Sequence, residues 1–248
     1  MRGGREQGRR EARFATGLTV ILANGAPPTH PVPLRLFRAA DRLIACDGAW
    51  RMALDLGRTP EAVVGDGDSI GEEGREALAQ KGIPFIDEKE QETNDLCKAF
   101  RHAVATGAKG DAVVILGATG RREDHALGNI FHLLDFAAAV PREGVGGADR
   151  LSARVSMVTD FGTFEPVLPP GGTWTAKAGR SVSVFAPVPG TRMTSEGLEW
   201  PLEGVALDAL WRGTLNRTTG DTFTLRTTHP ILLYRAHETL AIGGRFLV

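Results

Sequence analysis

Cysteine is scarce in this sequence, since only Cys46 and Cys97 occur among its 248 residues. The two thiols lack the spacing of a metal-binding motif. Both stand in locally apolar sequence, so we expect buried, reduced thiols in a cytoplasmic protein.

Long apolar runs are missing as well. No stretch approaches the roughly 18 apolar residues of a membrane-spanning helix. The basic opening, residues 1–13, has no apolar segment behind it, so we do not expect a secretory signal there. We expect a frayed tail there rather than an arm that binds nucleic acid, because the segment lacks the aromatic residues or repeats that would support such a role. The net charge of −1 gives no general pull toward nucleic acid or membrane, and we expect neither as a partner.

The composition is that of an ordinary globular protein, with 42% hydrophobic and 24% charged residues. The length of 248 residues is enough for one large domain or two small ones. Up to about residue 140, short apolar runs alternate with helical patterns. This alternation predicts a mostly parallel, Rossmann-like sheet covered on both faces. The expected strands are Leu18–Ala23, Arg42–Cys46, Ala62–Val64, Ile83–Ile86 and Ala112–Leu116. The expected helices are Val32–Ala40, Ala49–Leu56, Glu72–Gln80, Asp95–Thr106, with Asn94 as its cap, and one after Asp124.

The second half of the chain has a different sequence pattern. After residue 141, short runs rich in Thr, Val and Phe are separated by Gly and Pro, a pattern typical of a β-sandwich. We place an α/β domain at residues 17–150 and a β-sandwich domain at 151–248, although the strand near residue 155 fits either sheet. The expected strands are Arg154–Thr159, Thr163–Val167, Thr173–Ala176, Ser181–Phe185, Thr222–Arg226 and Ile231–Tyr234.

Acidic residues gather where the predicted strands end. Asp66 and Asp68 directly follow one apolar run, Asp47 follows another, and Asp95 and Asp124 stand near helix starts. In an open α/β sheet these ends form the ligand-binding crevice. Clustered carboxylates repel one another unless a cation lies among them, and oxygen ligands beside phosphate suit Mg²⁺. The competing interpretation is that such residues only form turns and helix caps.

A glycine-containing loop, Gly117–Gly120, leads into a helix, where backbone N–H groups can face phosphate. Arg121 and Arg122 add forked donors. The loop is neither GxxxxGK[ST] nor GxGxxG, so neither common nucleotide fingerprint applies. Lys98 could reach phosphate or pair with Asp95. Trp200, beside Pro201, is either a core plug or a plate on which a ligand ring stacks.

Together these motifs resemble the thiamine pyrophosphokinase family. The stretch GDGDSI (65–70) is similar to its GDxDS, EQETNDLCKA (90–99) to DQxxTDxxKA, and GATGRREDHALGN (117–129) to GxxGxRxDHxLxN. GLEWPL (197–202) and THPILL (228–233) follow in the expected order, so the resemblance covers nearly the whole chain.

The resemblance implies a homodimer that transfers pyrophosphate from ATP to thiamine, with Mg²⁺ as cofactor and AMP as the second product. It implies catalytic roles for Asp66, Asp68, Asp95 and Asp124, with the first three binding metal; ATP or phosphate contacts at Asp47, Ser69, Gln91, Lys98, Arg122 and His125; and thiamine contacts at Trp200, Thr214 and Asn216. Asp95 or Asp124 could accept the proton of the attacking hydroxyl.

The chain departs from the family pattern at several positions. Asn94 stands where Thr is usual, Arg121 where a second Gly is frequent, and Leu215 cannot donate the hydroxyl of the expected Ser. A pyrophosphokinase for another alcohol, such as a hydroxymethyl pterin, and a non-catalytic nucleotide or thiamine sensor therefore stay open. A haloacid-dehalogenase-type phosphatase ranks last, because residues 18–25 offer no nucleophilic Asp.

Overall fold

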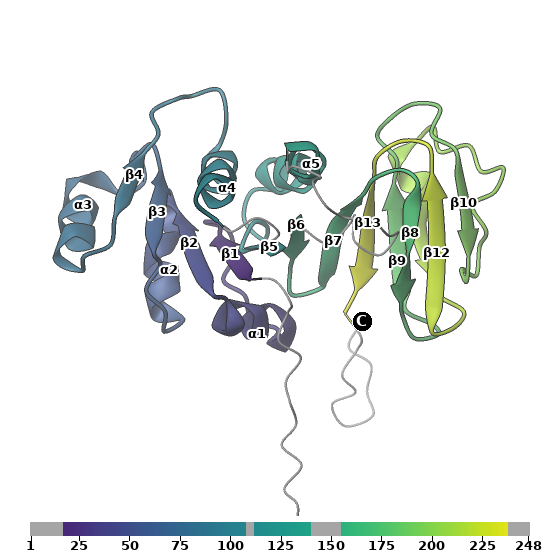
Figure 1. Ribbon diagram of the computed structural model, residues 1–248, viewed down its shortest axis with the longest axis horizontal. Helices are drawn as coiled ribbons and strands as arrows, with labels where there is room; N and C mark the ends of the chain where they lie inside the picture. The colour runs from purple at the N-terminus through teal and green to yellow at the C-terminus, as the bar shows by residue number, and fades with distance from the viewer. Residues whose placement is uncertain (1–16, 108–111, 140–154, 238–248) are drawn as a thin grey trace, which may run out of the picture.

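The protein is described by a computed structural model for residues 17–107, 112–139 and 155–237. One ten-stranded sheet, in the order β11-β9-β13-β7-β6-β5-β1-β2-β3-β4, runs through both halves of the molecule (Figure 1). Its parallel strands are β1 (Leu18–Leu22), β2 (Arg42–Cys46), β3 (Ala62–Gly65), β4 (Phe85–Asp87), β5 (Ala112–Leu116) and β6 (Val155–Val158).

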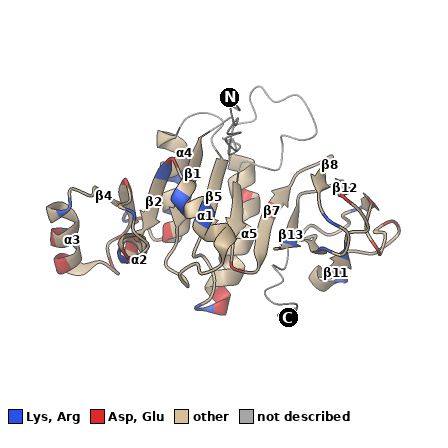
Figure 2. Ribbon diagram, turned by 90° about the horizontal axis from the view of Figure 1, so that it is seen from below, with Lys and Arg blue, Asp and Glu red and all other residues tan. Residues whose placement is uncertain are grey.

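Helices cover both faces of the parallel strands, as predicted (Figure 1). Alternation along β1 explains why: Ile21 packs toward α4 and α5, whereas Val20 and Leu22 pack toward α1 and α2. The helices are α1 (Pro31–Ala39), α2 (Trp50–Asp55), α3 (Gly71–Gln80), α4 (Asp95–Thr106) and α5 (Glu123–Ala139). Figure 2 shows α3, with its acidic residues, at the outer end of the molecule.

The second half is a β-sandwich. The antiparallel strands β7 (Gly162–Val167), β9 (Ser181–Phe185), β11 (Gly213–Arg217) and β13 (Ile231–Ala236) continue the long sheet. A second sheet of β8 (Gly171–Thr175), β10 (Met193–Glu196) and β12 (Thr222–Thr227) packs against it. Trp174, Phe223 and Leu233 belong to the core between the sheets.

Strand β6 joins the two halves. It pairs in parallel with β5 and antiparallel with β7, so it completes the first half's sheet. Our division of the chain at residue 150 stays a prediction. None of the helices in the described ranges is long and apolar enough to cross a bilayer.

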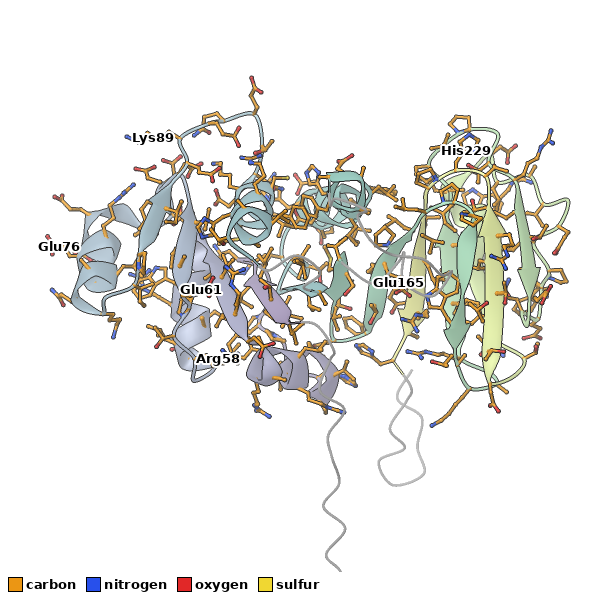
Figure 3. All side chains as sticks on the ribbon, in the orientation of Figure 1. Arg58, Glu61, Glu76, Lys89, Glu165 and His229 are labelled. Atoms are coloured by element: carbon orange, nitrogen blue, oxygen red, sulfur yellow. The ribbon has the colours of Figure 1, made fainter. Side chains whose placement is uncertain are left out.

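A buried ion pair lies beside this junction. Glu165 of β7 is 6% exposed and stands 2.7 Å from the Arg235 Nε of β13 (Figure 3 labels Glu165). Burial raises the pKa of Glu165, and the charge of Arg235 opposes that rise. A buried carboxylate needs a partner of opposite charge, and Arg235 provides one from the neighbouring strand.

Candidate active site

The candidate site lies at the carboxyl ends of the parallel strands. Because β1 lies between β5 and β2, the connections after β1 and β5 run in opposite directions along the sheet. This is the topological switch point where open α/β sheets bind ligands. A pocket of about 350 Å³ opens there, lined by Ala23, Asn24, Gly25, Cys46, Ser69, Asn94, Asp95, Leu96, Ala118, Thr119, Arg121, Arg122, His125 and Asn129.

Three carboxylates meet beside this pocket. Asp47 follows β2 directly, Asp66 follows β3, and Asp95 is the first residue of α4. One oxygen from each lies within 4.8 Å of the others. Of the acids predicted from sequence, the structure thus brings together Asp66 and Asp95, and adds Asp47, which we had expected to contact nucleotide. Asp68 is exposed and is not in this group, and its backbone N–H donates to Asp66 Oδ1 at 3.2 Å.

Asp47 is the buried member of the group. Its Oδ2 accepts hydrogen bonds from the backbone N–H groups of Gly67 (3.1 Å) and Ser69 (3.2 Å). Its Oδ1 is buried and has no hydrogen-bond partner within the described residues. Burial, together with the charges of Asp95 and Asp66, raises the pKa of Asp47. A buried carboxylate oxygen without a donor fits the role of a ligand to a cation.

Lys98 partly neutralises the group. Its ammonium, on a side chain 1% exposed, lies 2.9 Å from Asp66 Oδ2 and 3.3 Å from Asp95 Oδ1. The hydrogen bond from Lys98 lowers the pKa of Asp66, whereas burial and the charge of Asp66 raise the pKa of Asp95. One ammonium cannot balance three ionised carboxylates. The excess negative charge and the free Asp47 oxygen fit a divalent cation with oxygen ligands, such as Mg²⁺.

The backbone crowds this group. A Cβ at Gly65, the last residue of β3, would lie 2.5 Å from Asp47 Cβ and 3.2 Å from Asp95 Cγ. Only glycine allows both acids to approach the strand this closely.

The glycine loop forms the opposite wall of the pocket. Gly117 and Gly120 have φ values of 65° and 87°, and the Gly25 N–H donates to the Gly117 carbonyl at 2.6 Å. Arg121 Nη1 donates to Asn24 Oδ1 at 3.2 Å. The loop therefore carries positive charge to the pocket, within a backbone conformation that favours glycine.

Asp124 lies outside the carboxylate group of the structure. It is exposed and pairs with Arg122, whose hydrogen bonds hold the pKa of Asp124 at about 2. A carboxylate with so low a pKa is a poor proton acceptor. Of the two bases expected from sequence, this arrangement favours Asp95.

The remaining predicted phosphate contacts are near the pocket. Ser69 and His125 line it, and Gln91 Nε2 donates to Asp66 Oδ2 at 3.4 Å. Two lining residues were missed, Asn24 and Asn129. Asn24 stands two residues after the end of β1, so the rule of polar residues at strand ends would have found it. Asn129, inside α5, is the last position of the matched stretch GATGRREDHALGN, so the motif marked it although no role was assigned to it.

The predicted acceptor residues lie in the β-sandwich. Asn216, 4% exposed, accepts from the Trp200 N–H (3.2 Å) and donates to the Trp200 carbonyl (2.7 Å), so it holds this segment in place. The Trp200 side chain is 51% exposed. Thr214 donates to the Trp211 carbonyl, and Leu215, at φ 62°, is 82% exposed. Trp200 is thus half-exposed at the surface and is not a core plug, and its stacking on a ligand ring stays a prediction.

The strand-end carboxylates, the basic glycine loop and the switch-point pocket define an α/β protein of the phosphate-handling type. Comparison with known families makes the class specific. The family model described as thiamin pyrophosphokinase, catalytic domain, matches residues 34–141, and that of the substrate-binding domain matches residues 162–234. The chain belongs to the thiamin pyrophosphokinase family, as its motifs predicted.

Individual relatives agree with this assignment. Thiamine pyrophosphokinase 1 of Oryza sativa subsp. japonica is 36% identical over 83 residues, which is 32% of this chain and 31% of that protein. Thiamine pyrophosphokinase from Bacillus subtilis has a similar structure, with a TM-score of 0.70 at 20% identity, covering 88% of this chain and 98% of the other. Thiamin pyrophosphokinase from Candida albicans has a TM-score of 0.71 at 14% identity and covers 90% of each chain. These structures confirm the predicted fold, a parallel α/β sheet followed by a β-sandwich.

Proposed function

We propose that this protein transfers pyrophosphate from ATP to the hydroxyethyl group of thiamine, giving thiamine diphosphate and AMP. The observation that carries the proposal is the Asp47–Asp66–Asp95 group beside the basic glycine loop, in a chain of this family. The catalytic and metal-binding role that we expected for Asp68 remains a prediction.

The reaction is governed by charge. The thiamine hydroxyl oxygen bonds to the β-phosphorus of ATP, and the bond from that phosphorus to the oxygen bridging it to the α-phosphate breaks, so AMP leaves. Arg121, Arg122 and Lys98 supply positive charge toward the phosphates. Asp95, which stands at the start of α4 and lines the pocket, accepts the hydroxyl proton. Mg²⁺ held by Asp47, Asp66 and Asp95 would supply further charge neutralisation on the phosphate oxygens.

We also propose a homodimer, because one chain does not complete the site. The acids follow β2 and β3, whereas Trp200 is held by Asn216 on β11, at the far edge of the sheet (Figure 1). Seven strand spacings separate β11 from β2, which is about 34 Å along the sheet. Thiamine is too small to span this distance, so Trp200 of one chain would face the acids of the other.

Exposed apolar side chains support that interface. Leu210, Trp211 and Leu215 are 43%, 69% and 82% exposed, in the segment next to Trp200. Aromatic and apolar groups at the surface are typical of protein interfaces. The two buried, free cysteines fit the cytoplasm as the site of action.

The acceptor is the point that most needs a test. AMP release should be measured with thiamine and, separately, with a hydroxymethyl pterin, each with and without Mg²⁺. We expect AMP only with thiamine and Mg²⁺, and none from Asp66→Ala. Asp55→Asn, an exposed carboxylate on α2, is the control for loss of charge alone. AMP formed faster with the pterin would reassign the acceptor, and binding without any AMP would indicate a sensor.

A further inference from the structure

Two asparagine side chains connect the two walls of the pocket. Asn94 precedes α4, and its Oδ1 accepts the Cys97 N–H at 3.1 Å as the helix cap. Its Nδ2 donates to Asn129 Oδ1 on α5 at 3.0 Å. Asn129 Nδ2 then donates to the Ala118 carbonyl of the glycine loop at 3.0 Å. These hydrogen bonds form one continuous chain, which we call the asparagine bridge.

The bridge joins the parts of the site that would hold different ligands. Asn94 immediately precedes Asp95 of the carboxylate group in the sequence. Ala118, at the other end of the bridge, stands three residues before Arg121. Asn129 is 9% exposed and Ala118 is 5% exposed, so water competes little with the bond between them. A shift of α4 relative to the glycine loop must therefore break a hydrogen bond of the bridge.

The side-chain chemistry suits this task. Each amide accepts at its oxygen and donates at its nitrogen, and the bridge uses both ends of both side chains. An amide is also neutral, so the bridge adds no charge beside three carboxylates. A threonine at position 94 could still cap α4 through its hydroxyl, but its shorter side chain offers no amide donor for Asn129.

We propose that Asn94 and Asn129 are positioning residues that fix the spacing between the carboxylate group and the glycine loop. They thereby couple binding of the divalent cation to binding of the polyphosphate. This inference rests on the proposed function, since it takes Mg²⁺ and a nucleoside triphosphate as the ligands. It assigns these two residues no contact with the reacting atoms.

The test measures coupling by binding, without turnover. The dissociation constant of Mg²⁺ is determined by calorimetry in the absence and presence of α,β-methylene-ATP, whose α–β linkage is not cleaved. The proteins are wild type, Asn94→Thr, Asn129→Ala and the double variant. Breaking a bridge between neutral groups should reduce the coupling about tenfold. Because the bridge acts as a unit, the double variant should lose no more than Asn129→Ala.

Two outcomes would overturn the inference. One is unchanged coupling in both single variants, whether or not their Tm falls. The other is additive losses in the double variant, which would indicate independent ligand contacts. His132→Ala, one turn further along α5, is the control for a general disturbance of this helix. Asn94→Thr keeps the cap and so keeps the test valid if Asn129→Ala fails to fold. AMP release by the wild type is measured separately, so failure of the proposed function remains distinguishable.

Discussion

Replacing Asp47 by Asn should stabilise the metal-free protein and weaken its binding of Mg²⁺. The amide oxygen can still accept the N–H groups of Gly67 and Ser69, as Asp47 Oδ2 does now. The amide nitrogen would take the place of the buried Oδ1, which has no partner. There it becomes a donor toward the neighbouring carboxylates instead of a third negative charge.

The magnitude follows from the geometry. At 4.8 Å, two carboxylates repel each other by about 3.5 kcal/mol at an effective dielectric constant of ~20. Lys98, close to Asp66 and Asp95, offsets most of this repulsion. We expect a net gain of about 1–2 kcal/mol in the free energy of unfolding. For a chain of this length, that gain raises Tm by roughly 2–8 °C. Loss of one charged ligand should weaken Mg²⁺ binding at least about tenfold.

The assay is thermal unfolding in EDTA and in saturating MgCl₂, with calorimetry for Mg²⁺ affinity. Asp55→Asn serves as the matched control, since it removes an exposed charge. We expect Asp47→Asn to melt above wild type in EDTA and to gain little from Mg²⁺. A variant that melts below wild type in EDTA, yet keeps wild-type affinity for Mg²⁺, would refute the assignment of Asp47 to a cation site.

Further predictions test the surroundings of the site. The free energy of unfolding of Asp47→Asn should exceed that of the metal-free wild type by a growing amount as pH rises from 3.8 through the raised pKa of Asp47. The folded wild type holds the Asp47 proton more tightly than the unfolded chain, so losing that proton destabilises the wild type, whereas Asn does not titrate. A difference that stays constant in urea titrations at several pH values would contradict this. Lys98→Met should cost about 3–5 kcal/mol of stability in EDTA, and Mg²⁺ should restore part of it by replacing the lost charge. Equal effects of Mg²⁺ on the Tm of variant and wild type would argue against that. Trp200→Ala should raise the KM for thiamine about tenfold and leave the KM for ATP nearly unchanged; steady-state kinetics with an unchanged KM for thiamine would remove Trp200 from the site.

Local signals in the sequence were enough to predict much of the fold. Helix α4 matches its predicted range, Asp95–Thr106, because its apolar stripe, its Asn94 cap and Gly107 all act within a few residues. Strands β10 and β11 were missed. The first is the polar run Met193–Glu196, and the second contains a bulge between Gly213 and Asn216, so neither shows the apolar alternation of a strand.

The sequence indicated the edge of the sheet where the carboxylates meet, but not the direction in which each side chain points. Strand ends identify the edge where Asp47, Asp66 and Asp95 meet, because parallel strands bring their carboxyl ends together. They do not reveal which way a side chain points after the strand. Asp68 turns outward beyond Gly67, whose φ of 86° redirects the chain. Nor does a sequence reveal the hydrogen bond between Asn94 and Asn129, which are 35 residues apart and meet only because the start of α4 lies beside α5.

The passage of one sheet through both halves limits how the molecule can move. Ladder hydrogen bonds continue from β5 through β6 to β7 without a gap, and the Glu165–Arg235 pair stands beside that crossing. A joint of this kind has no hinge about which the α/β half could close over a substrate. Rearrangement of the strand-end loops would enclose a substrate without breaking these ladder hydrogen bonds.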